Sequence, residues 1–599
     1  MERDAGGLLG MSLGLAFFSL YVFGLAVNEI LYWPLTALFF LPTLWEGWKV
    51  GKALVHSGGQ FKINRWSPWL AVPLVLWLFE YLSPPLVWDA ILDHFRYARE
   101  VSRLHQVLFH WTNHTGDMPK AAELVLAGFW NLGGESFSKL TSALPALLTA
   151  WLLRVFSREW SEKEGLEQWI FWTCPFFLAL FGWGYIEGFL AFFEVLALYC
   201  LWRALQEPKI AFWLPLMAFF LGTAFSIKYT AVLAIAPIGV VLVYEKMVRK
   251  NPIRLGWHCL LVFVLPLLPW LLKNGLAFGN PFYPLAISLF GGGTGYSPEM
   301  ERGLLADTGL PTLSGLSRLP QTLWSSFFTP LNAVNAPWTP LAVMGLPWVL
   351  EMVGKKAGRF LATFSLLFFG GWIFVSSSFR HASGGALVLV LLASMAWGEA
   401  FKERKTGAKL LFGVGSGLAL WLCLSAQLTT TAPYASALGL EDPLLRLKRH
   451  YSYDLDTYAA YRGMEAHSQP KDKVIAFGVY QTYPLQRIAF VDFKWKRPIF
   501  LQWASQCRTA EQLARLLREE GVRYFLYQKW EAASISHGEK DFNLVGMPVS
   551  EYVRFWKYFM QPVGIYENSF VYEARITPLS VSEKLGLLPG LDEKTSMTP

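Results

Sequence analysis

The sequence predicts a polytopic α-helical membrane protein with a small soluble domain at its C-terminal end, and three observations lead to this fold class. Of its 599 residues, 54% are hydrophobic and only 16% are charged, whereas an ordinary soluble domain has about 25% charged residues. A soluble fold of this size could not bury so much apolar surface, but a bilayer accommodates it because its interior is itself apolar. The 28 tryptophans fit the same class, since tryptophan favours membrane–water interfaces.

Apolar runs that could cross a bilayer recur between residues 9 and 426. A spanning helix needs about 20 mostly apolar residues, or somewhat fewer with interfacial help. The first run follows Met-Glu-Arg-Asp, without a basic region or cleavage site, so we expect a retained span rather than a signal peptide. About thirteen spans are predicted, near residues 9–27, 30–46, 68–83, 138–154, 167–184, 187–204, 210–226, 229–245, 257–272, 338–353, 361–377, 384–400 and 408–426.

Lysine and arginine residues gather in alternate connections between these runs. The six basic connections lie near residues 49–65, 154–163, 203–209, 246–254, 355–359 and 402–409. The positive-inside rule makes that side cytoplasmic, which also explains the net charge of +8 without nucleic-acid binding. A multi-pass protein of the cell inner membrane is therefore expected, with a cytoplasmic N-terminus. Two long segments, 84–137 and 273–337, and everything after about residue 427 fall on the outer side.

The composition changes near residue 450, where charge rises and the long apolar runs stop. Strands are predicted at 473–479, 487–492, 523–527, 563–566 and 570–573, with helices at 509–520 and 550–560. The first of these helices opens on a capping box, Thr509 with Gln512 three residues later. The expected domains are 1–67, with extra spans; 68–426, the membrane catalytic domain; 450–577, an extracytoplasmic α/β domain; and 578–599, a tail. The α/β part carries no metal spacing or phosphate loop, so a packing or acceptor-docking module is the simplest interpretation.

Acidic residues at the outer ends of spans are the first candidates for chemistry, because ionisable groups at membrane depth are costly and usually functional. Asp89, in Trp88-Asp89-Ala-Ile-Leu-Asp93-His94, could act as a general base toward a hydroxyl. It could equally be a helix N-cap. Glu187 lies in a turn between two apolar runs, where it could be a second acid, a metal ligand, a hydroxyl acceptor or a simple turn residue.

Cations at the same ends of spans form a second group, which departs from the charge bias of the other loops. They are Lys228, Lys273 and the pair Arg380-His381. A shared anionic ligand would explain them, and phosphate is the natural candidate. Lipid head-group anchoring is the alternative for each. Acids and phosphate-binding cations at one face together suggest glycosyl transfer from a polyprenyl phosphate, in which an acid deprotonates the hydroxyl and cations stabilise the departing phosphate.

Several segments resemble, in the same order, the bacterial membrane glycosyltransferases of the C-type fold, relatives of protein O-mannosyltransferases and of the lipid A aminoarabinose transferase. The similar segments are Trp88-Asp89-Ala through Phe95, with Asp93 where the family usually has tyrosine; Asp117-Met-Pro119 through Glu123; Glu187; Thr223 to Ala231; Pro269 to Asn274, with Lys273; Gly279 to Pro284; and Arg380-His381. Together they cover roughly residues 68–400.

The resemblance implies a role for each matching residue. Asp89 would be the catalytic base, and Lys228 and Arg380 would contact the donor phosphate. The remaining substrate-binding candidates are Asp93, His94, Glu123, Glu187, Lys273 and His381. Some relatives of this fold need a divalent metal and others do not. No dense carboxylate cluster in the sequence indicates one, so we expect no metal site and no other cofactor, with a divalent metal as the alternative.

The predicted function is a hexosyl- or pentosyltransferase that moves a sugar, with inversion, from a polyprenyl-phosphate donor to a hydroxyl acceptor on the outer face. The acceptor could be a glycolipid, a polysaccharide or a protein. A flippase or transporter of lipid-linked sugars is the alternative, since it would use the same cations without a general base. Transporters often show an internal repeat, which the two halves of this chain lack.

Overall fold

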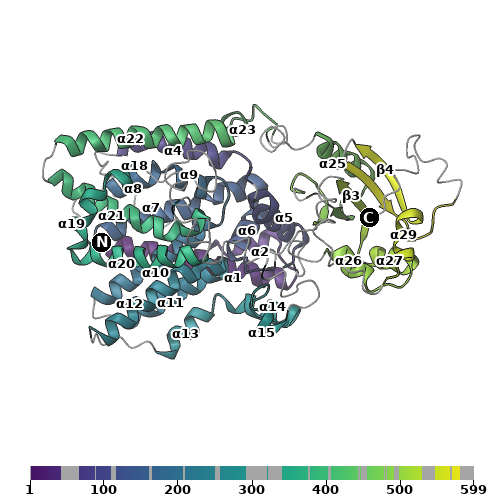
Figure 1. Cartoon of the computed structure of the whole chain (residues 1–599), viewed down its shortest axis with the longest axis horizontal. Coiled ribbons are helices and arrows are strands. Elements are labelled where there is room, and N and C mark those ends of the chain that lie inside the picture. Colours follow the sequence, from purple (N-terminus) through teal and green to yellow (C-terminus); the bar gives the residue numbers. More distant parts are fainter. Residues whose placement is uncertain are drawn as a thin grey trace.

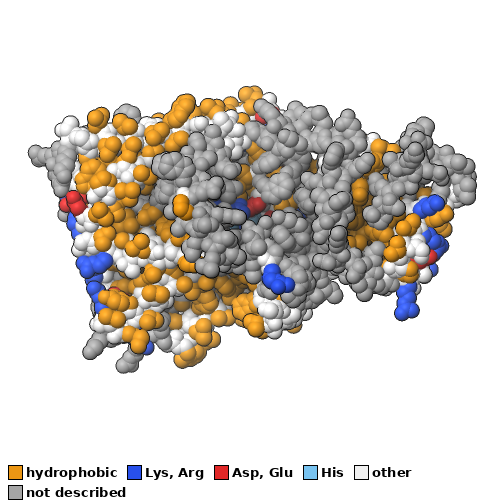
Figure 2. Space-filling model, viewed as in Figure 1, with side chains coloured by type: hydrophobic (Ala, Val, Ile, Leu, Met, Phe, Trp, Pro, Cys, Tyr) orange, Lys and Arg blue, Asp and Glu red, His pale blue; other side chains and the backbone are white. Residues whose placement is uncertain are grey.

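The computed structural model contains a helical body and, beside it, a smaller unit with a β-sheet (Figure 1). On the face shown in Figure 2, hydrophobic side chains cover much of the described surface of the helical body. Such a surface is suited to lipid rather than water. The residues described are 2–41, 67–87, 89–108, 117–160, 165–206, 210–249, 256–291, 302, 320, 340–375, 378–402, 406–442, 446, 455–477, 479, 482–491, 498–528, 547–566 and 569–580.

The helical body is built from helices of very different length, several of them interrupted near one end. Its elements are α1 (Glu2–Val27), α2 (Trp33–Leu38), α4 (Ser67–Leu82), the π-helix η1 (Ala90–His94), α5 (Phe95–Leu104), α6 (Ala121–Thr141), α7 (Ala143–Ser157), α8 (Leu166–Trp172), α9 (Pro175–Gly182), α10 (Glu187–Gln206), α11 (Ile210–Ile227), the 3-10 helix η2 (Tyr229–Ala231), α12 (Val232–Met247), α13 (Trp257–Val264), α14 (Leu268–Phe278), α15 (Ile287–Phe290), α18 (Pro340–Met344), α19 (Leu346–Val353), α20 (Lys356–Val375), the 3-10 helix η3 (Phe379–Ala382), α21 (Ser383–Lys402), α22 (Thr406–Ala426), the π-helix η4 (Gln427–Thr431) and α23 (Pro433–Ala437).

Among the described residues, six helices are long and apolar enough to cross a membrane, and the number rises to eight if two bent helix pairs each count as one span. The bent pairs are α6 with α7, at 45°, and α13 with α14, at 65°. The chain is thus a multi-pass helical membrane protein, as predicted. The number thirteen, the domain limits and the sidedness stay predictions.

Several predicted segments differ from the structure. The long outer segment 84–137, in which no span was predicted, is largely helical in its described part, because η1, α5 and most of α6 lie in it. The predicted span 167–184 is two short helices, α8 and α9, separated at Thr173 and Cys174. Pro175 is the first residue of α9, and proline cannot donate the backbone hydrogen bond that would continue α8.

Helix α10 lies at the centre of the body, because 94% of its apolar 18-residue stretch is buried. The turn before it contains Gly184, whose φ of +94° suits glycine. A side chain at Gly184 would collide with Phe95 and approach Ala90. The start of α10 and the η1–α5 segment can therefore pack closely only because this residue has no side chain.

The C-terminal unit is a five-stranded mixed sheet in the order β2-β1-β3-β5-β4, flanked by helices. β1 is parallel to β2 and β3, while β5 is antiparallel to β3 and β4. The predicted capping box is present, since Thr509 accepts a hydrogen bond from the Gln512 backbone. The elements are α25 (Leu455–His467), β1 (Lys473–Phe477), β2 (Ile488–Val491), α26 (Ile499–Ala504), α27 (Ala510–Glu519), β3 (Val522–Gln528), α29 (Val549–Tyr558), β4 (Met560–Tyr566) and β5 (Ser569–Ala574).

Helix α5 joins this unit to the helical body through a row of arginines. Arg96, Arg99 and Arg103 share one helical face, since they are spaced three and four residues apart. Their guanidinium groups donate to the backbone carbonyls of Ala489, Tyr483 and Pro470, respectively. The helix that directly follows η1 is thereby fixed to the C-terminal unit.

Candidate active site

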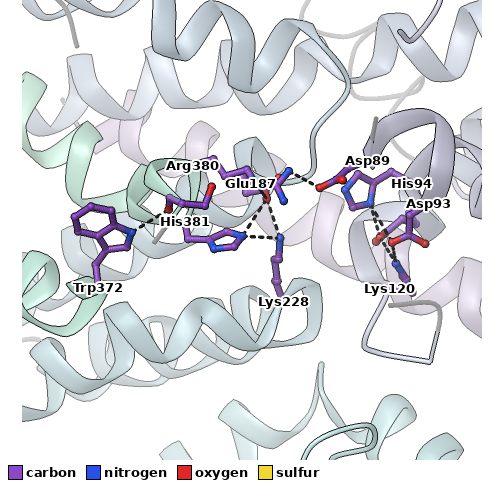
Figure 3. A network of polar contacts seen from close by, with 11 residues as sticks. Asp89, Asp93, His94, Lys120, Glu187, Lys228, Trp372, Arg380 and His381 are labelled. Carbon is purple, nitrogen blue, oxygen red and sulfur yellow. Dashed lines mark hydrogen bonds and ion pairs between the residues drawn. The ribbon is translucent and has the colours of Figure 1, made fainter. Parts of the chain in front are cut away.

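The polar residues of the candidate site come from four breaks between helices at one end of the body. Asp89 precedes η1, and Glu187 is the first residue of α10. Lys228 precedes η2, and Arg380 and His381 lie within η3. Figure 3 shows that these side chains converge, although they come from segments far apart in the sequence.

Glu187 is the centre of the first cluster. Its side chain is fully buried, and its Oε1 lies 2.8 Å from Lys228 Nζ and 3.4 Å from Arg380 Nε. His381 Nε2 is 3.7 Å from the same oxygen. A buried carboxylate is stable only when opposite charges and hydrogen bonds replace water. Glu187 therefore orients the two cations, so it is not a simple turn residue. Because its side chain is fully buried, a substrate cannot reach it.

Arg380 connects Glu187 to Asp89, because its Nη1 forms an ion pair with Asp89 Oδ2. Its guanidinium also lies over the Tyr185 ring, 5.1 Å from the ring centre. The Arg380 side chain is 18% exposed and that of Asp89 is 29% exposed, so both can be reached from outside the protein. Asp89 directly precedes η1, but its side chain makes no capping hydrogen bond.

The turn that carries Arg380 is held by neighbouring side chains. Trp372 Nε1 donates a hydrogen bond of 2.9 Å to the Ser378 carbonyl (Figure 3). Lys228 Nζ lies 3.2 Å from His381 Nε2. An ammonium can only donate, so this nitrogen of His381 is an acceptor and carries no proton. His381 thus helps to position Lys228.

A second cluster is formed by Asp93, His94, Lys120 and Glu123, and Figure 3 shows the first three of these residues beside Asp89. Glu123 Oε1 is 2.9 Å from both His94 Nδ1 and Lys120 Nζ, and Lys120 also binds Asp93 Oδ2. Every side chain of this cluster is at most 7% exposed. Burial alone would lower the pKa of Lys120, but the adjacent carboxylates Asp93 and Glu123 outweigh it, so that this pKa is raised.

Three groups of this cluster could hold a metal ion, since ligand atoms of Asp93, His94 and Glu123 lie within 4.8 Å of one another. The Lys120 ammonium, however, contacts both carboxylates. It supplies the positive charge that a metal ion would otherwise bring. A metal ion at this position would have to displace that ammonium.

The structure brings together all but one of the residues selected from the sequence. Lys273 is not a member of either cluster as defined above; its side chain lies 3.4 Å from Asn274 Oδ1 and over the rings of Trp270 and Phe278. Sequence reasoning missed Lys120 and Tyr185. Lys120 could have been found, because it precedes Glu123 by three residues in an otherwise apolar stretch, which is the spacing of a helical ion pair.

Comparison with known proteins supports the fold expected from the sequence. Residues 117–271 match the family of dolichyl-phosphate-mannose-protein mannosyltransferases. No curated protein matches the chain. Two crystal structures of ArnT from Cupriavidus metallidurans, one bound to undecaprenyl phosphate and one in the apo state, are similar, with TM-scores of 0.54 and 0.53 and 13% sequence identity. The matches cover 86% and 85% of this chain and 99% and 98% of the ArnT chains. The chain therefore has the C-type membrane glycosyltransferase fold, and the resemblance found in the sequence is confirmed.

Proposed function

We propose that this protein is a membrane glycosyltransferase that moves a sugar from a polyprenyl-phosphate donor to a hydroxyl acceptor, with inversion, and that Asp89 is the general base. The observation that carries the proposal is the bridge formed by Arg380, which contacts both the accessible Asp89 and the buried Glu187. A base and two phosphate-binding cations are thereby held within one cluster. The mannosyltransferase match and the undecaprenyl phosphate bound to ArnT support a lipid-linked donor.

The reaction needs one proton acceptor and one stabilised leaving group. The acceptor oxygen attacks the anomeric carbon, and Asp89 takes the hydroxyl proton. The bond from the anomeric carbon to the phosphate oxygen breaks, and its electron pair stays with the polyprenyl phosphate. Lys228 and Arg380 stabilise that negative charge, and Glu187 holds both cations in place beforehand. One base is sufficient, because phosphate is already a good leaving group.

The ion pair between Asp89 and Arg380 gives the donor a way to prepare the base. A phosphate and the Asp89 carboxylate are both anions, so they compete for the same guanidinium. When the donor phosphate binds Arg380, it releases Asp89 toward the acceptor. Before substrate binds, the Asp89 carboxylate therefore contacts the same guanidinium that the donor phosphate later contacts.

The test is transfer of a labelled sugar by purified Asp89→Asn protein. We expect the rate to fall by about 10²-fold or more, the usual effect of losing a general base. Binding of polyprenyl phosphate should be kept or become tighter, because asparagine no longer competes as an anion. Asp442→Asn, the same change at an exposed residue, is the matched control. Undiminished turnover would exclude Asp89 as the base. Weaker phosphate binding would show that Asp89 only holds Arg380 in position.

A flippase or transporter of lipid-linked sugars is the second candidate, since Lys228 and Arg380 could hold a phosphate without any reaction. Such a protein has no use for a base, so Asp89→Asn would leave movement of the lipid across the membrane unchanged. The accessible carboxylate beside the cations favours the transferase.

A further inference from the structure

Helix α5 holds charged side chains in a buried position, where arginine and glutamate are rare unless they are paired. Arg96, Arg99 and Glu100 are all buried. Arg99 Nε and Nη2 donate to Glu100 Oε1 at 3.0 and 2.6 Å, so that these two charges neutralise each other. The Arg99 guanidinium also lies over the Tyr483 ring, 5.2 Å from the ring centre. Such burial is costly in a helix that only connects two parts of a chain, so these arginines need a further explanation.

The two buried arginines contact two different segments of the C-terminal unit. Arg96 donates to the carbonyl of Ala489 in β2, which is an edge strand of the sheet. Arg99 donates to the carbonyl of Tyr483, in the connection between β1 and β2. A guanidinium presents its N–H groups in a rigid plane, so such contacts fix the orientation of a helix as well as its distance. The position of α5 is therefore tied to the sheet.

The same helix is continuous with the segment that begins at Asp89. Asp89 directly precedes η1, and η1 passes without a break into α5. Asp89 and Arg96 are seven residues apart, which corresponds to about 10 Å along a helix. Single π-helical turns are frequent at functional sites. A displacement of α5 would therefore be transmitted to Asp89.

A close contact with the turn before α10 leaves η1 and α5 little room to shift. A methyl group at Gly184 would lie 2.8 Å from the Phe95 ring and 3.2 Å from Ala90. The turn that leads to Glu187 thus packs directly against the segment that follows Asp89. This segment is in contact with the C-terminal unit and with the turn that leads into α10.

We propose that Arg96 and Arg99 are positioning residues, through which the C-terminal unit holds Asp89 where it can take the proton of the acceptor hydroxyl. The inference rests on the proposed function, in which Asp89 is the general base. A displacement of about 1 Å at a reacting group can slow a reaction by about 10²-fold. The two arginines would therefore set the turnover rate, whereas binding of the donor phosphate would depend on Lys228 and Arg380.

The main variant is Arg99→Met with Glu100→Leu. It removes both charges of the buried pair, so no lone carboxylate remains, and an apolar pair is often as stable as a buried ion pair. Arg523→Met with Glu573→Leu is the matched control, because it removes an arginine–glutamate pair of 2.8 Å within the C-terminal sheet. Arg96→Gln is the second variant and removes the donor to β2.

Sugar transfer, polyprenyl-phosphate binding, thermal melting and hydrogen–deuterium exchange are measured on the full-length protein in detergent. We expect Arg99→Met with Glu100→Leu to lower kcat by about tenfold or more, while KM for the donor and binding of polyprenyl phosphate change by less than about twofold. Amide exchange of residues 89–95 should become faster, and exchange around residue 228 should not. Arg96→Gln should act in the same direction. The control pair should transfer sugar and exchange as wild type does.

Hydrogen exchange distinguishes a failure of this proposal from a failure of the proposed function. If wild type transfers no sugar but exchange of residues 89–95 responds as expected, the transferase assignment fails and the connection between the C-terminal unit and Asp89 stands. Unchanged exchange of residues 89–95, or unchanged turnover of the variants of an active protein, would overturn the proposal. An equal loss of polyprenyl-phosphate binding, or early melting of both variants, would also overturn it, because the arginines would then only stabilise the fold.

Discussion

The two charged clusters at the predicted outer end are built from similar residues but differ in exposure. In the cluster around Glu187, the outer members Asp89, Lys228 and Arg380 are 18 to 29% exposed. In the cluster around Glu123, every side chain is at most 7% exposed. The first, the open cluster, can exchange its internal ion pairs for contacts with a ligand. The second, the closed cluster, is too buried for a ligand to reach. We infer that the first carries the chemistry and that the second positions the η1 segment that follows Asp89.

The largest effect should come from removing a cation of the open cluster. We expect Arg380→Gln or Lys228→Met to slow sugar transfer by about 10² to 10³-fold, because a preorganised donor at a developing charge is lost. Binding of polyprenyl phosphate, measured by native mass spectrometry, should weaken in the same variants.

Arg359→Gln is the matched control, since Arg359 is an exposed arginine whose Nη2 donates to the Gly354 carbonyl at 3.1 Å. It should transfer sugar as wild type does. An Arg380→Gln protein with normal turnover would contradict the role of the open cluster.

A change in the closed cluster should act on stability first. Lys120→Met leaves Asp93 and Glu123 buried without their shared cation, which should destabilise the protein by about 3 to 5 kcal/mol. The measurement is the thermal melting temperature in detergent.

The matched control breaks a more exposed ion pair. Arg523 Nε is 2.8 Å from Glu573 Oε1, and these side chains are 32% and 25% exposed. Arg523→Met should cost at most about 1 kcal/mol. If the two variants melt alike, the closed cluster is not a stabilising element.

The smallest effect should come from a metal chelator. Because the Lys120 ammonium already contacts both carboxylates of the closed cluster, we expect EDTA to change the transfer rate of wild type by less than about twofold. Loss of activity on chelation, restored by one divalent cation, would assign Asp93, His94 and Glu123 to a metal site instead.

The helical membrane class and most of the open cluster were predicted, because a charged residue next to an apolar run can be recognised from the sequence alone. It could not predict the contacts, since Asp89, Glu187 and Arg380 meet only through tertiary packing. A helix after Asp89 was expected as far as about Arg103, and α5 lies there, but the burial of its charged residues Arg96, Arg99 and Glu100 was not predicted. Those arginines are buried because they contact the C-terminal unit, and a local sequence pattern cannot predict such a contact.

The most direct test of the central claim uses the purified protein in liposomes with a radiolabelled polyprenyl-phosphate sugar and an extract of cell-envelope acceptors. We expect the label to move to the acceptor fraction while unlabelled polyprenyl phosphate is released, and we expect this transfer to be about 10²-fold slower or worse in Asp89→Asn. Passage of intact labelled donor across the bilayer without product would contradict the account and identify a flippase.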